Sequence, residues 1–368
     1  MTNSISSNRL VSLDAYRGLT MFLLIAEAAG VYASLTHLAA EGTFGAAIVT
    51  QFHDHPWNGL RFWDLIQPFF MFIVGVAMPF SLRSRMAKGA TWNEAFKHIL
   101  VRCGMLLAFG VGLHCVYNQK LVWELWNVLS QLSFTILITF LLMRLPIRSQ
   151  LIASLLLLAL TEILYRTYDP AAPFVKDQNF GSWMDMILMG KINPGGGWVT
   201  INCIPTAAHT IWGAVCGKLL LTWKGESTRI IKNFVVAGII GLVIGYGLDI
   251  MGVTPIVKRI STVSFVFASG GWCLLTLALF YWLVDVKKQR KWTKMFVIVG
   301  MNSIFIYLFA EVLGHRWLYG FVQIFNDGFL GVLGLSTEVL AVTAAIFTLA
   351  IMWYLCYFLY KKKIFFKI

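Results

Sequence analysis

Two histidines flank an aspartate within the segment 51–83. His53, Asp54 and His55 stand directly before the turn-forming run Pro-Trp-Asn-Gly at 56–59, and a long apolar stretch follows. An imidazole titrates near neutral pH and can act as a base, an acid or a nucleophile. Polar residues at the mouth of a membrane helix are costly to keep without a purpose. We therefore expect the chemistry of the chain in this segment.

The same triplet permits two other interpretations. A His-Asp-His run can cap a loop through hydrogen bonds and take no part in chemistry. Two imidazoles and Asp54 could also bind zinc, but no fourth ligand is evident and adjacent loop residues seldom ligate one ion together. We therefore expect no metal site, and the structural interpretation stays open beside the chemical one.

The composition predicts an integral membrane protein. The chain has 368 residues, of which 58% are hydrophobic and 13% charged, and its mean hydropathy is +0.72. A soluble domain carries about 25% charged residues, so lipid must solvate this apolar excess. The net charge of +13 comes from short basic clusters between apolar runs, as the positive-inside rule expects. Neither zinc-finger spacing nor an RNA-binding aromatic motif is present, so we expect no nucleic-acid partner.

The apolar runs predict a polytopic, all-α helical bundle. A spanning helix needs about 20 mostly apolar residues. Basic residues gather in every second loop and in the C-terminal tail, which predicts that both termini are cytoplasmic. We expect one membrane domain over 1–368, in contact with lipid, and the loop at 314–337 could add an eleventh, re-entrant helix. The ten predicted spans are 17–38, 62–82, 98–117, 122–143, 149–166, 201–222, 230–250, 260–284, 295–313 and 338–360.

Near the start of the first predicted span, Asp14 and Arg17 are three residues apart. This spacing can place both side chains on one helix face. Arg17 could neutralise Asp14, or it could hold a phosphate with its planar fork of donors. The spacing alone leaves both interpretations open.

From this motif onward the sequence resembles the heparan-α-glucosaminide N-acetyltransferase family and its bacterial relatives. The opening block is SLDAYRGLTMF, and further blocks follow in the family's order along most of the chain. Each block alone is weakly specific, whereas their shared order is a specific signal. The further blocks are HDHPWNGLRFWDLIQPFFMFIVG, VLSQLSFTILIT, TINCIPTAAHTIWGAVCGKLL, PIVKRISTVSF and GMNSIFIYLFAEV.

The resemblance implies a multi-spanning acyltransferase of the bacterial inner membrane. Such an enzyme takes an acetyl group from cytoplasmic acetyl-CoA and delivers it to a sugar or amino sugar in the periplasm. The family histidine stands three residues before the tryptophan, where this chain has Asp54. We therefore predict His55 as the catalytic residue, with His53 as the second choice and Asp54 orienting a neighbouring imidazole. Asp64 faces the histidine loop in this prediction and supports it.

The remaining site predictions concern the donor and the acceptor. Acetyl-CoA is polyanionic, so its site should be basic, and the developing oxyanion needs donors nearby. A family asparagine late in the first helix is replaced by Ala28, beside Glu27. The predicted donor-binding residues are Arg17, Asp14, Lys258, Arg259 and Asn302; the predicted acceptor-binding residues are Trp57, Asn58 and Glu27.

Two other classes of function remain as alternatives. A secondary transporter could use the buried carboxylates without covalent chemistry, but transporters often show inverted repeats and the two halves of this chain show no convincing one. A structural partner in a cell-envelope complex would not need the 53–55 triplet. Within the enzyme hypothesis, N- or O-acylation, direct transfer or an acetyl-histidine intermediate, and a monomer or a homodimer all stay open.

Overall fold

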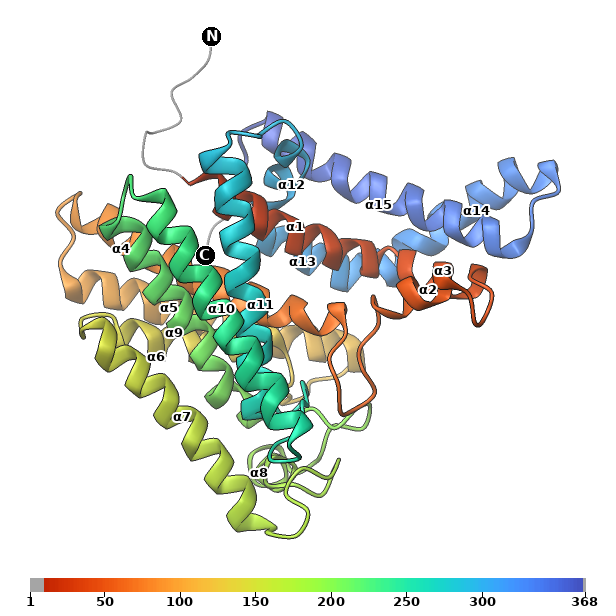
Figure 1. Cartoon of the computed structure of the whole chain (residues 1–368). Helices are drawn as coiled ribbons and strands as arrows, with labels where there is room; N and C mark the ends of the chain where they lie inside the picture. The colour runs from red at the N-terminus through yellow and green to blue at the C-terminus, as the bar shows by residue number, and fades with distance from the viewer. Residues whose placement is uncertain (1–9, 367–368) are drawn as a thin grey trace. The chain divides into compact units, whose positions relative to one another are not determined.

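A computed structural model of the chain describes residues 10–366, except for the side chain of His315, and these residues are overwhelmingly helical (Figure 1). Within them the only β-pairing is an isolated bridge between Asn58 and Val257. The all-α prediction is confirmed. The α-helices are α1 Val11–Ala28, α2 Val31–Leu38, α3 Phe44–Thr50, α4 Ile66–Met86, α5 Trp92–Asn118, α6 Val128–Leu142, α7 Ile147–Tyr168, α8 Phe180–Met189, α9 Cys203–Thr222, α10 Ser227–Ile250, α11 Val263–Phe280, α12 Thr293–Gly300, α13 Ser303–Phe309, α14 Tyr319–Leu330 and α15 Thr337–Lys361.

Six helices of the described chain are long and apolar enough to cross a membrane. Two bent pairs raise the number to eight if each pair counts as one span: α1 with α2, bent by 61°, and α12 with the helices at 303–333, bent by 78°. The ten predicted spans all coincide with helices, but α6 is only 15 residues long and α9 contains several polar residues. The count of ten and the cytoplasmic termini stay predictions. The six helices are Phe62–Met86, Trp92–Asn118, Ile147–Tyr168, Ser227–Ile250, Val263–Val286 and Thr337–Lys361.

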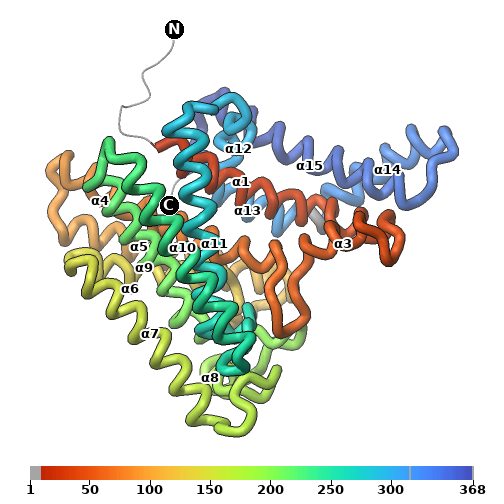
Figure 2. Tube along the Cα trace, in the orientation of Figure 1, coloured from red at the N-terminus to blue at the C-terminus, as the bar shows by residue number. Residues whose placement is uncertain are grey.

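The chain divides into two compact units. Unit 1 comprises residues 10–54, 61–63 and 279–366, and unit 2 comprises His55–Leu60 and Asp64–Ala278. In the colour scale of Figure 2, unit 1 takes the red and blue ends and unit 2 the colours between them. The boundary passes between Asp54 and His55, inside the histidine triplet. The interpretation of 1–368 as a single membrane domain stays a prediction.

In unit 1 the first helix packs against α12, from the C-terminal part of the chain. A Cβ atom added to Gly18 would lie 2.0 Å from the carbonyl oxygen of Phe296, so the two backbones are in direct contact. The buried ring of Tyr16 stacks on Phe280 with 5.3 Å between the ring centroids. This packing fixes the helix that carries Asp14 and Arg17.

Unit 2 is organised around the closely packed pair α4 and α9. A Cβ atom on Gly75 would lie 2.1 Å from the carbonyl oxygen of Thr210, and one on Gly213 would lie 2.1 Å from that of Phe72. Small residues permit this backbone-to-backbone approach inside a membrane bundle. The helix α9 therefore packs closely against α4.

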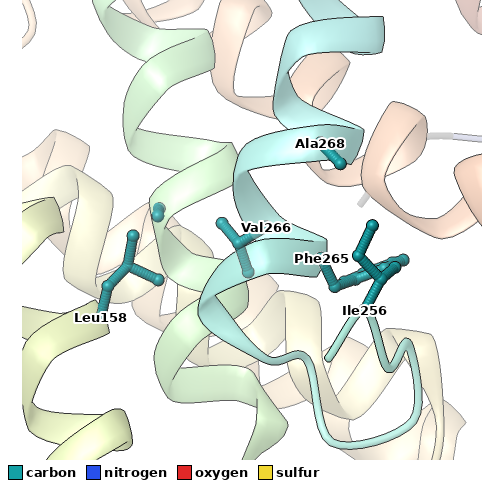
Figure 3. Packing of buried hydrophobic residues seen from close by; sticks show 6 residues of the cluster. Leu158, Ile256, Phe265, Val266 and Ala268 are labelled. Carbon is teal, nitrogen blue, oxygen red and sulfur yellow. The ribbon is translucent and has the colours of Figure 1, made fainter. Parts of the chain in front are cut away.

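A buried cluster next to α9 holds the segment that leads into α11. Leu158 of α7, Ala208 of α9 and Val266 of α11 belong to this cluster, together with Phe265, Ala268 and Ile256. Figure 3 shows Ile256 and Phe265 beside each other, with Val266 directed toward Leu158. Because Ile256 is 1% exposed, the residues that follow it are carried on an anchored segment.

His209 is a packing residue of this core. It is fully buried, and its Nε2 lies 2.8 Å from the Oγ of Ser269 on α11. Ser269 in turn donates to the carbonyl of Phe265. A hydrogen-bonded packing role accounts for this histidine.

Candidate active site

The turn after the histidines is pinned to the segment before α11. The backbone N–H of Gly59 donates to the carbonyl of Ile256 at 2.8 Å, and Asn58 forms the antiparallel bridge with Val257. Gly59 has φ +142°, a conformation that other residues adopt only under strain. The sequence Trp-Asn-Gly is thus needed to bring residues 55–60 against residues 256–257.

The imidazole of His55 lies directly over this glycine. A Cβ atom on Gly59 would lie 2.5 Å from Nε2 of His55 and 2.7 Å from its Cε1. The ring is half-buried, and its Nδ1 has no hydrogen-bond partner among the residues that the structure describes. An imidazole that is held in place and keeps a ring nitrogen unengaged is suited to accept a proton or to attack an acyl group.

Asp64 supports the histidine through the backbone. Its side chain is fully buried, and the N–H of His55 donates to both carboxylate oxygens at 3.4 and 3.3 Å. The Nζ of Lys258 lies 3.5 Å from the same carboxylate. Asp64 therefore faces the histidine loop, as the sequence predicts, although it contacts the main chain of His55 in place of its ring.

Lys258 and Arg259 join the histidine loop to the segment around residue 196. The ammonium of Lys258 lies 5.5 Å from the ring centroid of Trp198, within cation–π range. The Nη1 of Arg259 donates to the carbonyl of Pro56 at 3.1 Å and to that of Gly196 at 2.7 Å. The two cations predicted to bind the donor are thus placed beside His55 and Asp64.

Trp57 forms a wall of this region and Asn58 is exposed. The indole N–H of Trp57 donates to the carbonyl of Phe174 at 3.1 Å. Its Cζ3 atom would lie 3.0 Å from a Cβ on Gly197, which itself has φ +74°. Asn58 is exposed beside its bridge to Val257. Trp57 and Asn58, two of the three predicted acceptor-binding residues, therefore belong to the same unit as His55.

His53 and Asp54 belong to unit 1 and have other neighbours. The Nε2 of His53 lies 2.7 Å from the hydroxyl of Thr36, at an exposed position. The carbonyl of Asp54 accepts a hydrogen bond of 2.9 Å from Arg61. Within 10–366, no group of three or more His, Cys, Asp and Glu side chains is arranged to hold a metal ion.

The other predicted residues of unit 1 are engaged in different ways. Arg17 donates to Asp14 at 2.9 Å, which is one of the two interpretations that their spacing leaves open. The side-chain amide of Asn302 donates to the carbonyl of Ile364 at 3.1 Å and accepts the N–H of Phe366 at 3.0 Å, so it fastens the C-terminal segment.

Glu27 lies on an exposed face of α1. Its place in the acceptor site stays a prediction.

Two further carboxylates lie close to the loop that carries Trp198. Glu124 is buried and accepts hydrogen bonds from Lys191 and His114. Burial raises the pKa of Asp185, although hydrogen bonds from Trp126 and Thr200 act in the opposite direction. No site role for these residues or for Trp198 follows from the sequence. The Pro-Gly-Gly-Gly-Trp run at 194–198 was the signal available for this loop.

Comparisons with known proteins identify the family of the chain. A family model described as the catalytic region of heparan-alpha-glucosaminide N-acetyltransferase matches residues 9–245. The heparan-alpha-glucosaminide N-acetyltransferase of Mus musculus is 25% identical over 439 aligned residues, covering 100% of this chain and 62% of the mouse protein. That of Homo sapiens is 24% identical over 428 aligned residues, covering 98% and 60%. The chain thus spans less than two thirds of the length of these relatives. The matched region contains the Asp14–Arg17 motif, the 53–64 segment and most of unit 2, and the chain belongs to the heparan-α-glucosaminide N-acetyltransferase catalytic family.

Proposed function

We propose that this protein is a membrane acyltransferase that moves an acetyl group from acetyl-CoA to an amino sugar, with His55 as its base or nucleophile. The family and the names of its two relatives support the reaction class and the acceptor. The observation that carries the assignment of His55 is its ring over Gly59, beside the Asp64–Lys258 pair, with Nδ1 unengaged among the described residues.

In the direct reaction the acceptor amine attacks the carbonyl carbon of the thioester. His55 takes the proton that the amine loses, the C–S bond breaks, and the sulfur leaves as the thiol of CoA after it regains a proton. The ammonium of Lys258 is the nearby donor for the developing oxyanion. Asp64 holds the backbone of His55 and the ammonium of Lys258 in place.

The same residues support a two-step route. A nitrogen of His55 would attack the thioester and release CoA, and the acetyl-imidazole would then transfer its acetyl group to the amine. The two routes differ in whether label from acetyl-CoA stays on the protein when no acceptor is present.

The finer topology belongs to the same proposal. We infer ten spans, both termini in the cytoplasm, and residence in a bacterial inner membrane, with acetyl-CoA reaching the protein from the cytoplasm and the acceptor lying in the periplasm. The basic inner loops support the orientation. Arg17, paired with Asp14, remains our candidate contact for a phosphate of acetyl-CoA.

The test uses purified full-length protein in lipid nanodiscs with acetyl-CoA and a panel of amino sugars. Release of free CoA and acetylation of the sugar are measured together, and acetyl-CoA binding is measured separately. His55→Gln is compared with His53→Gln. Turnover that is lost only in His55→Gln, with binding retained, supports the proposal. Wild-type protein that neither binds nor consumes acetyl-CoA would contradict it and favour transport of a solute.

A further inference from the structure

A loop at 190–200 is anchored at its start by a buried carboxylate. The Nζ of Lys191 lies 2.5 Å from Oε1 of Glu124. The second oxygen of Glu124 accepts from Nδ1 of His114 at 2.7 Å and from the amide of Asn118 at 3.2 Å. Glu124 is 7% exposed. A carboxylate with three donors is a well-defined anchor, because each donor limits the freedom of the others.

The same loop is anchored at its end by a second carboxylate. Asp185 is fully buried on α8, and one of its oxygens accepts the backbone N–H of Thr200 at 3.0 Å. Its other oxygen accepts the indole N–H of Trp126 at 2.6 Å. The ring of Trp126 lies 5.9 Å from the ammonium of Lys191. The two anchors are therefore connected through this tryptophan.

Between its anchors the loop is rich in glycine and touches the candidate active site. Gly195, Gly196 and Gly197 follow one another, and glycine leaves a backbone with many accessible conformations unless contacts restrict it. The carbonyl of Gly196 holds Arg259, and the ring of Trp198 faces Lys258. The position of this loop thus affects both cations beside His55.

We propose that Glu124 is a positioning residue of the acyl-transfer reaction, acting through Lys191 to hold the 190–200 loop against Lys258 and Arg259. This inference rests on the proposed function. Glu124 does not contact the reacting atoms in it. Loss of the anchor would let the glycines move, so that Trp198 and Gly196 would no longer fix the two cations that are predicted to bind acetyl-CoA.

The first arm of the test measures hydrogen–deuterium exchange in the segment 190–200 and needs no activity. Glu124→Gln and Lys191→Met are expected to raise exchange in this segment roughly fivefold or more, the scale of losing a charge-assisted hydrogen bond. Lys191→Met keeps the Glu124 contacts with His114 and Asn118, so it serves if Glu124→Gln folds poorly. The matched control is Glu226→Gln, which removes an exposed ion pair with Arg229 in the same unit. Unchanged exchange in both Glu124→Gln and Lys191→Met would show that the Glu124–Lys191 ion pair does not hold the 190–200 loop.

The second arm measures steady-state kinetics of the same variants. Lys191→Met is expected to raise KM for acetyl-CoA roughly threefold to tenfold, the scale of a lost hydrogen bond, while KM for the amino sugar stays unchanged. Lys191→Arg, which keeps the charge, is expected to restore most of the wild-type KM. Raised exchange with unaltered kinetics, or a loss that Lys191→Arg does not restore, would overturn the positioning role. Failure of the proposed function has a different signature, since wild-type protein would then show no acetyl transfer at all.

Discussion

The two histidines of the triplet have the same chemistry and very different surroundings. His53 is half-buried, as His55 is, and its Nε2 shares an exposed hydrogen bond with the hydroxyl of Thr36 in unit 1. His55 lies over Gly59, and its backbone is held by the buried carboxylate of Asp64. Although the two histidines are almost adjacent in sequence, they thus differ in how closely the ring is packed and in whether a buried carboxylate holds the backbone. The neighbours of an imidazole, more than its presence in a motif, identify the candidate base.

The largest expected effect comes from removing the imidazole of His55. His55→Gln should lower kcat for acetyl transfer by roughly 10²- to 10⁴-fold, the usual contribution of a positioned acid or base. Acetyl-CoA binding should be preserved, because Gln retains polarity and similar size. Rates of CoA release measured with saturating acetyl-CoA and amino sugar provide the comparison with wild type.

A chemical rescue experiment serves as the control for this variant. If His55 acts as a base, added imidazole should restore part of the rate of His55→Ala. If His55 acts as a nucleophile, wild-type protein incubated with radioactive acetyl-CoA and no acceptor should carry the acetyl label, and His55→Ala should not. A His55→Gln variant with wild-type kcat would remove His55 from the mechanism.

A second effect is expected at the carboxylate that distinguishes His55 from His53. Asp64→Asn should lower kcat by roughly tenfold to 100-fold, as is typical for residues that orient a functional group. It should also destabilise the protein by roughly 3 kcal/mol, because it leaves the buried ammonium of Lys258 without its carboxylate. Activity and thermal unfolding in detergent are measured together.

The double variant Asp64→Asn with Lys258→Met separates these two consequences. Removing both charges should restore much of the stability, since a buried ion pair adds little over apolar packing, but it should leave kcat low. Recovery of kcat together with stability would show that Asp64 matters only for folding.

The third effect concerns the glycine below the His55 ring. Gly59→Ala places a methyl group 2.5 Å from Nε2 at a residue with φ +142°, so the ring must move and the turn is strained by roughly 1–3 kcal/mol. We expect a loss of kcat of roughly tenfold or more, the scale on which misplaced catalytic groups act. Gly45→Ala is the matched control, because its nearest neighbour would be 3.7 Å away, and it should keep wild-type activity. Equal activity in both variants would argue against a fixed ring at His55.

The sequence predicts the all-α fold class and indicates the segment 51–83 as the candidate site, because both inferences depend on local patterns. Apolar runs define helices wherever they occur, and the i, i+3 spacing of Asp14 and Arg17 is sufficient for their ion pair. The sequence cannot show that Lys258 lies beside Asp64, since these residues are far apart in the chain and only tertiary packing joins them.

Two other site predictions depend on contacts that the sequence does not encode. Glu27 lies on an exposed face of α1, and hydropathy does not show which face of a helix meets its neighbours. Asn302 lies in a block that resembles the family, yet its amide fastens the C-terminal segment. The loop around Trp198 had only turn-forming residues to mark it, and such residues indicate a bend without indicating what the bend contacts.

The smallest effect is expected from the other histidine of the pair. His53→Gln removes one exposed hydrogen bond to Thr36, which is worth about 1 kcal/mol at most, and Gln can replace part of it. Kinetic parameters for acetyl-CoA and for the amino sugar should therefore stay within about threefold of wild type, well below the loss expected for a catalytic base. Measured beside His55→Gln in the same lipid preparation, this variant tests the assignment most directly. If His53→Gln lost more activity than His55→Gln, the catalytic role would pass to His53, and the contacts of Asp64, Gly59 and Lys258 would have to be interpreted as supports of the fold.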